Sequence, residues 1–82
     1  MPTPRTWVVR TPEDLGRTIA GVRAERGLTQ ADLAGELSID RSYLAGIESG
    51  SGTTLALERT LMALRRLGAQ VTVTIDADVI DG

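Results

Sequence analysis

The chain has 82 residues, a length that suits one compact domain and is too short for two. It contains no cysteine and no histidine, so the usual nucleophile pairs, general bases and transition-metal ligands are missing, and we expect no enzyme, no metal site and no cofactor. No apolar run is long enough to span a membrane, and the lack of cysteine is typical of intracellular proteins, so we expect a cytoplasmic chain.

The formal net charge of −2 argues at first sight against a nucleic-acid partner, because phosphate-binding domains are usually basic. The distribution of charge weakens this objection, since the positive charge is concentrated in residues 1–10 and 51–75. Three aspartates fall within the last seven residues, at Asp76, Asp78 and Asp81. Their spacing does not fit a calcium-binding loop, so we interpret residues 77–82 as a solvated acidic tail.

The chain opens with the β-prone run at residues 6–9. We interpret residues 1–10 as an arm laid on the domain or a short strand, and prefer the arm. A helix is then expected from Thr11, an N-cap that is followed by Pro12 at the first helical position and by Asp14, an acid that can complete a capping box. The apolar residues that continue this helix toward Gly27 are Leu15, Ile19 and Val22.

Two short helices are predicted next. Thr29 and Asp32 form a second capping box, ahead of a stripe expected to be buried, namely Leu33, Ala34 and Leu37. Asp40 is the expected N-cap of the following helix, whose apolar positions are Leu44 and Ile47 and which stops at Ser49-Gly50. Apolar spacing from residue 30 to 49 fits two helices that cross over a tight turn, with Ala34 small at the crossing and Ile39 closing the turn.

A fourth helix is expected from about Thr54 to Leu67, with Gly68 as its stop. The period then changes from helical to alternating, which predicts a strand whose apolar side carries Val71, Val73 and Ile75. Such a strand has no obvious partner in a helical chain, and an unpaired edge invites pairing with another chain. We therefore predict a homodimer in which these three residues pack across a two-fold axis. The run from Trp7 to Val9 is the alternative partner, within the same chain.

The segments Leu28-Thr29-Gln30-Ala31-Asp32-Leu33-Ala34 and Ile47-Glu48-Ser49-Gly50 resemble the Xre/Cro/C1 family of repressors, whose motif begins TQ-x-x-LA and closes near IE-x-G. This resemblance covers roughly residues 12–67. With the opening at residues 11–16 and the strand at residues 71–75, the chain is most similar to HipB-like antitoxins.

The resemblance implies a mainly α, lambda-repressor-like fold of four to five helices. It places the helix-turn-helix domain at residues 11–68 and a strand that pairs across a homodimer at residues 69–76. It also implies a sequence-specific DNA-binding repressor that recognises an inverted-repeat operator. In the HipB-like reading, the chain is the antitoxin of a type II toxin-antitoxin pair, controls its own operon and neutralises a toxin similar to HipA kinases. The alternative is a stand-alone Xre-type regulator with no toxin partner.

By family position, the start of the third helix faces the major groove, which puts Arg41 and Ser42 nearest the base edges. Gln30 and Thr29 open the second helix, where they can hold a phosphate. The full set expected to contact DNA is Thr29, Gln30, Asp40, Arg41, Ser42, Tyr43, Ala45 and Gly46.

Each of these residues also has a plainer reading. Arg41 can be a solvated surface arginine, Tyr43 can cover the helix pair, and Gly46 can be neutral drift. The arginines of the first helix could add phosphate contacts, but we read them as a solvated face: Arg17, Arg23 and Arg26. Three acids are read as a cap and surface groups: Asp32, Glu36 and Glu48.

Two positions depart from the family pattern. Ser38 stands at the turn where glycine is usual, so a left-handed conformation there would cost about 1 kcal/mol. Ala45 and Gly46 occupy positions where longer polar side chains often read bases. Direct readout is therefore expected to rest on few residues.

Overall fold

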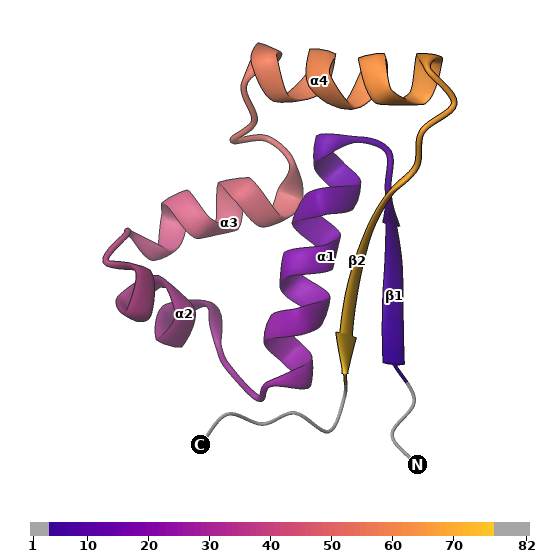
Figure 1. Ribbon diagram of the computed structural model, residues 1–82. Helices are drawn as coiled ribbons and strands as arrows, with labels where there is room; N and C mark the ends of the chain where they lie inside the picture. Colours follow the sequence, from indigo (N-terminus) through magenta and orange to yellow (C-terminus); the bar gives the residue numbers. More distant parts are fainter. Residues whose placement is uncertain (1–3, 77–82) are drawn as a thin grey trace.

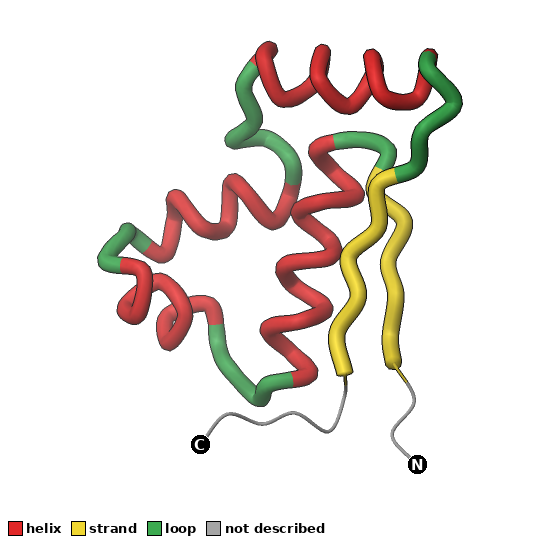
Figure 2. The backbone as a smooth tube through the Cα atoms, viewed as in Figure 1, coloured by secondary structure: helices red, strands yellow, loops and turns green. Residues whose placement is uncertain are grey.

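The computed structural model describes residues 4–76, which form four α-helices and one two-stranded antiparallel sheet (Figures 1 and 2). In chain order the elements are β1 (Pro4–Val9), α1 (Pro12–Glu25), α2 (Gln30–Leu37), α3 (Arg41–Ser49), α4 (Leu55–Arg66) and β2 (Val71–Asp76). The expected mainly helical fold is confirmed. The pairing of two copies stays a prediction, and the acidic tail at residues 77–82 lies outside the described residues.

Most of the predicted helix starts are confirmed by their capping hydrogen bonds. The side chains of Thr11, Thr29 and Thr54 each accept a hydrogen bond from the backbone N–H three residues later. At Thr29 the capping box is complete, because the Asp32 carboxylate also accepts from the Thr29 N–H at 2.9 Å.

Two caps differ from expectation in their side-chain bonds. The carboxylate of Asp14 accepts from the backbone N–H of Arg10, at 2.9 Å, in place of the Thr11 N–H that a full capping box requires. Asp40 precedes α3 in the expected extended conformation, but its side chain makes no capping hydrogen bond. The start of α3 is therefore set by backbone geometry and by packing rather than by a side-chain cap.

The strand β2 has a partner within the chain, so the expectation that it lacks one is wrong. It pairs antiparallel with β1, and the register places Trp7 opposite Val73 and Val9 opposite Val71. Residues 4–9 form the short strand that was the second reading of this segment and not the preferred arm, and residues 1–3 lie outside the described residues. Trp7 and Val9 of β1 continue the apolar face formed by Val71 and Val73 of β2. The two strands together thus present one apolar face that can be buried against the helices.

The sheet packs on α1 through that shared face. Trp7 lies against Gly21 of α1, where an added Cβ would come within 3.0 Å of the indole ring. The guanidinium of Arg5 lies 5.3 Å from the centre of the Trp7 ring and also pairs with Glu25 of α1. On the opposite face, the hydroxyls of Thr6 and Thr74 share a hydrogen bond of 3.1 Å.

Helix α1 lies at the centre of the molecule, with α2 and α3 on one side, the sheet on another and α4 across its end (Figure 1). The fully buried apolar residues among those described are few: Val9, Ala34, Leu44 and Leu61. Leu37, the last residue of α2, was expected in the buried stripe of that helix but is 54% exposed, so this expectation is wrong. No described helix is long and apolar enough to cross a membrane.

Candidate nucleic-acid interface

The second and third helices are joined by a turn whose shape depends on one left-handed residue. Ser38 has φ 57° and ψ 42°, so the turn keeps the conformation that glycine normally supplies. The N–H of Ile39 then donates to the carbonyl of Ala34 at 3.0 Å and closes the end of α2. Ala34 is 2% exposed, consistent with its predicted place at the helix crossing. This turn fixes the direction in which α3 leaves α2.

Helix α3 is held against α1 by contact between their backbones. A Cβ on Gly16 of α1 would lie 2.7 Å from the carbonyl carbon of Glu48 and well inside contact distance of the carbonyl oxygens of Ile47 and Glu48. Only a residue without a side chain fits at this crossing. This close approach brings the side chain of Glu48 beside Arg23, which lies two turns further along α1.

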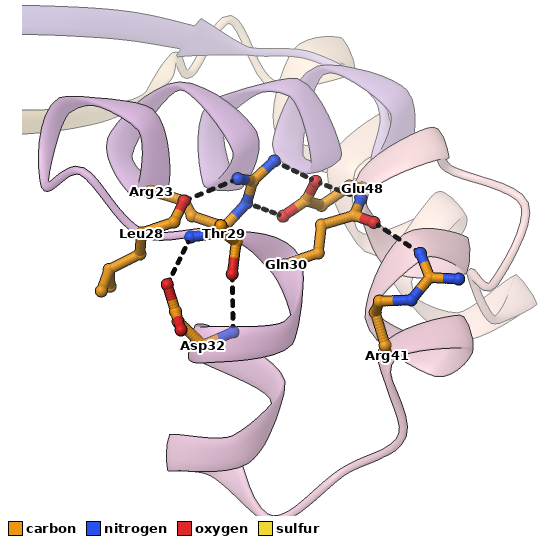
Figure 3. Close-up of polar contacts among 7 residues, drawn as sticks. All are labelled: Arg23, Leu28, Thr29, Gln30, Asp32, Arg41 and Glu48. Carbon is orange, nitrogen blue, oxygen red and sulfur yellow. Dashed lines mark hydrogen bonds and ion pairs between the residues drawn. The ribbon is translucent and has the colours of Figure 1, made fainter.

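A buried ion pair links these two helices (Figure 3). Nε of Arg23 donates to Oε2 of Glu48 at 2.8 Å, and Nη2 donates to Oε1 at 3.0 Å. The Glu48 side chain is only 6% exposed and the Arg23 side chain 17%. Arg23 also donates to the carbonyl of Leu28 at 2.8 Å, which ties the connection between α1 and α2 to the same guanidinium.

The ionised form of Glu48 is favoured by this pairing. The hydrogen bond from Arg23 is the largest influence and lowers the pKa of Glu48 below its usual value, while burial acts in the opposite sense. The hydrogen bond from Gln30 and the positive charge of Arg23 lower the pKa further. Glu48 is therefore a charged acceptor at neutral pH.

Glu48 sets the orientation of Gln30, the first residue of α2. Because a carboxylate only accepts hydrogen bonds, the amide nitrogen of Gln30 must face it, and Nε2 donates to Oε1 of Glu48 at 2.9 Å. The amide oxygen of Gln30 is then turned toward α3, where it accepts from Nη1 of Arg41 at 3.2 Å. Figure 3 shows the resulting chain of contacts from Arg23 through Glu48 and Gln30 to Arg41.

Arg41 is the exposed end of this chain of contacts. One of its N–H groups is engaged by Gln30, and a guanidinium carries five N–H donors in a rigid plane. The arrangement can thus present a preoriented, planar cation at the surface, at the first residue of α3. Such a group suits bidentate binding to phosphate or to the O6 and N7 acceptors of guanine.

A family model described as a helix-turn-helix domain matches residues 14–74. The chain belongs to this helix-turn-helix family. Over 65 residues it is 29% identical to an uncharacterized HTH-type transcriptional regulator, y4mF, of Sinorhizobium fredii (strain NBRC 101917 / NGR234). That match covers 79% of this chain and 84% of the relative. No solved structure matches the chain.

Most of the residues expected to contact DNA lie at the surface of the helix-turn-helix unit. The exposed ones are Thr29, Asp40, Arg41, Ser42 and Tyr43. Tyr43 is 59% exposed, which argues against the reading in which it covers the helix pair. The half-buried ones are Gln30, Ala45 and Gly46.

Gly46 is oriented toward its own domain. A Cβ at this position would be in ordinary van der Waals contact with Gly52 and with the Ser51 side chain, in the loop after α3. This placement favours the plainer reading of Gly46, in which it has no role in approaching DNA. The exposed residues at the start of α3 are Arg41, Ser42 and Tyr43.

Sequence reasoning misread the two residues that organise this site. Glu48 was expected to be a surface acid and Arg23 part of a solvated face, and both expectations are wrong because the two side chains bury each other's charge. The available signal was position: Glu48 follows Leu44 by one helical turn, and Leu44 is the most buried large residue of the chain described. An acid on a buried stripe needs a cationic partner, which points to α1.

Proposed function

We propose that the chain is a sequence-specific DNA-binding repressor that places the start of α3 in the major groove. The observation that carries this proposal is the Gln30–Arg41 hydrogen bond at the surface, backed by the buried Arg23–Glu48 pair. Membership of the helix-turn-helix family and the similarity to a transcriptional regulator support a DNA-binding regulator. The role of each residue rests on the arrangement around Arg41.

Arg41 is proposed to read a guanine. Its guanidinium can donate two parallel hydrogen bonds to O6 and N7, a contact worth roughly 1 to 3 kcal/mol of discrimination against another base. Because Gln30 already holds one N–H of Arg41, less side-chain freedom is lost when the base is bound. Ser42 and Tyr43 lie on the same exposed turn, beside Asp40.

Thr29 and Gln30 are proposed to lie against the DNA backbone at the positive end of α2. The second copy of the chain in a homodimer would read the other half of an inverted repeat, about 34 Å away along the duplex. Acids near this surface, among them Asp32 and Glu36, repel the DNA phosphates. Operator affinity is therefore expected to depend on a small number of favourable contacts. Losing one contact should therefore be easily measured.

The test is binding to a DNA fragment from upstream of the chain's own gene, followed by fluorescence anisotropy at low salt. Arg41→Ala is expected to weaken binding by roughly tenfold to a hundredfold. Arg66→Ala is the matched control, because it removes one exposed positive charge at the end of α4, far from α3 (Figure 1). Absence of binding at low salt, or equal losses from both substitutions, would overturn the proposal.

We further propose that this repressor is the antitoxin of a type II pair and neutralises a HipA-like kinase toxin. Support comes from the resemblance to HipB-like antitoxins, together with a strand that directly follows the helical domain. Co-expression with the product of the adjacent gene tests this role. Association and growth rescue are expected. If the two proteins neither associate nor neutralise each other, the stand-alone regulator holds and DNA binding is unaffected.

A further inference from the structure

An open apolar groove runs along one side of α1. Its volume is about 320 Å³. Six aliphatic side chains line it, namely Leu15, Ile19, Val22, Leu28, Leu33 and Val73. All six are only half-buried. Since aliphatic side chains of this size are usually enclosed in a core, the groove is a stretch of core that residues 4–76 leave uncovered.

The strand β2 ends beside one end of this groove. In the sheet register Arg5 lies opposite Ile75, and it also pairs with Glu25 in the last turn of α1. The groove reaches the same end of α1, where Arg26 and Leu28 line it. The chain therefore leaves β2 close to the end of the groove, beside the last turn of α1 (Figure 1).

The segment that follows β2 has the composition that this end of the groove calls for. Residues 77–82, which lie outside the described residues, contain the adjacent aliphatic pair Val79 and Ile80. Exposed to water, such a pair stabilises nothing, whereas its burial removes apolar surface from water. Asp78 and Asp81 flank the pair, so each end of it carries a negative charge.

Charge and length also match. Arg26 lines the groove at the end where β2 stops, and a guanidinium has five N–H donors with which to meet more than one acceptor. Six residues of extended chain span at most about 20 Å. A helix with its side chains is about 10–12 Å across, so six residues are long enough to pass the end of α1 and reach the start of α2.

We propose that residues 77–82 fold over this end of the groove in their own chain. The aliphatic pair packs on Leu28 and Leu33, and the flanking aspartates lie beside Arg26. A segment tethered next to the groove has a high effective concentration there, which favours it over the same segment of another copy. This contact is separate from the proposed DNA binding and from the proposed homodimer, and it replaces the reading of the segment as a solvated tail.

The proposed contact lies next to the helix-turn-helix unit. Leu28 and Leu33 flank the residues that open α2, Thr29 and Gln30. Arg23, which holds Glu48, also lines the groove. Cover at this place removes water from beside that ion pair, which strengthens it. The segment is therefore expected to steady the first turn of α2.

Nuclear Overhauser effects between methyl groups test the contact in the full, unmodified chain. Effects are expected between Ile80 and both Leu28 and Leu33. A sample mixed from labelled and unlabelled chains separates contacts within one chain from contacts between copies. Effects between copies alone would give the groove to a second copy, and their absence from Ile80 would leave the segment in solvent. Either result would overturn the proposal.

Melting temperature provides the second measurement. Ile80→Asn is expected to lower it by roughly 4–8 °C, because a polar amide replaces a buried aliphatic side chain. Leu67→Asn is the matched control: Leu67 is 81% exposed, so its loss should change the melting temperature little. Equal shifts from the two substitutions would contradict the contact. Operator binding enters neither measurement, so failure of the proposed function would leave this contact standing.

Discussion

At the scale of single residues, one buried acid determines how the half-buried Gln30 and the exposed Arg41 are oriented. Glu48 accepts from Arg23 on one side and from Gln30 on the other, and Gln30 then holds Arg41. A neutral amide at position 48 could turn either end toward Gln30, so the fixed orientation depends on the carboxylate. The charge of Glu48 matters even though it does not reach the surface.

Glu48→Gln is expected to make stability less dependent on acid pH. The pKa of Glu48 is lowered on folding, as are those of Asp32 and Asp14, so the unfolded chain binds more protons in this range. The stability these groups supply is present above their unfolded pKa values, about 4, and is lost as pH falls through the lower folded values. In the Glu48→Gln chain, the part of this acid-induced loss of stability that comes from Glu48 is absent.

The measurement is the melting temperature by circular dichroism between neutral and acid pH. The Glu48→Gln chain should melt lower at neutral pH and show a shallower decline below about pH 4.5. Glu58→Gln, which changes an exposed acid of α4, serves as the control and should follow the unmodified chain. Parallel pH curves for all three proteins would contradict the role given to Glu48.

Ser38 carries a backbone strain that a single substitution should relieve. Its φ of 57° is the region where an L side chain clashes with its own backbone, so Ser38→Gly is expected to stabilise the domain by about 1 kcal/mol. For a domain of this size that corresponds to a rise of roughly 4–8 °C in melting temperature. Ser38→Ala keeps the Cβ and should give no rise. An equal gain from both variants would assign the effect to loss of the hydroxyl.

At the scale of the elements, the sequence predicts helices well because their signals are local. Threonine caps and glycine stops lie within a few residues of the ends that they define, as at Thr29 and Gly50. The pairing of β1 with β2 joins residues more than sixty positions apart, and no local pattern states it. The burial of Glu48 was missed for a similar reason, since it depends on a partner in another helix.

The crossing of α1 and α3 depends on a glycine that sequence patterns do not single out. Gly16→Ala is expected to destabilise the domain by about 3 kcal/mol, because the new methyl group meets backbone carbonyls that cannot rotate away. Gly35→Ala in α2 is the matched control: nothing lies within 4 Å of its Cβ, so helix propensity alone should raise stability by up to about 1 kcal/mol. Urea unfolding monitored by circular dichroism measures both.

A second outcome separates position from simple unfolding. If Gly16→Ala moves α3 away from α1 without unfolding the chain, operator affinity should fall more than stability does, because Arg23 would no longer hold Glu48 in the position from which it orients Gln30. Equal and small effects from both alanine variants would show that α1 and α3 do not cross this closely.

At the scale of the whole molecule, the thin shape goes with a small buried core. Four helices and two strands spread over 39 by 36 Å leave little apolar surface enclosed, as the four buried apolar residues show among those described. A domain of this size buries only about 60% of its unfolded surface even when compact. In the proposed homodimer, much of the stability of each chain is therefore expected to come from the second copy.

If the chain is the proposed homodimer, folding is coupled to association, and the melting temperature should depend on protein concentration. A hundredfold dilution should lower the stability of each dimer by about 2.7 kcal/mol and so lower the melting temperature by several degrees. The chain has one tryptophan, Trp7, which packs on Gly21 and lies opposite Val73 in the sheet. Its fluorescence therefore reports on unfolding next to β2, the strand predicted to lie at the dimer interface. Superimposable melting curves for the unmodified chain at every concentration would mean that one copy folds by itself.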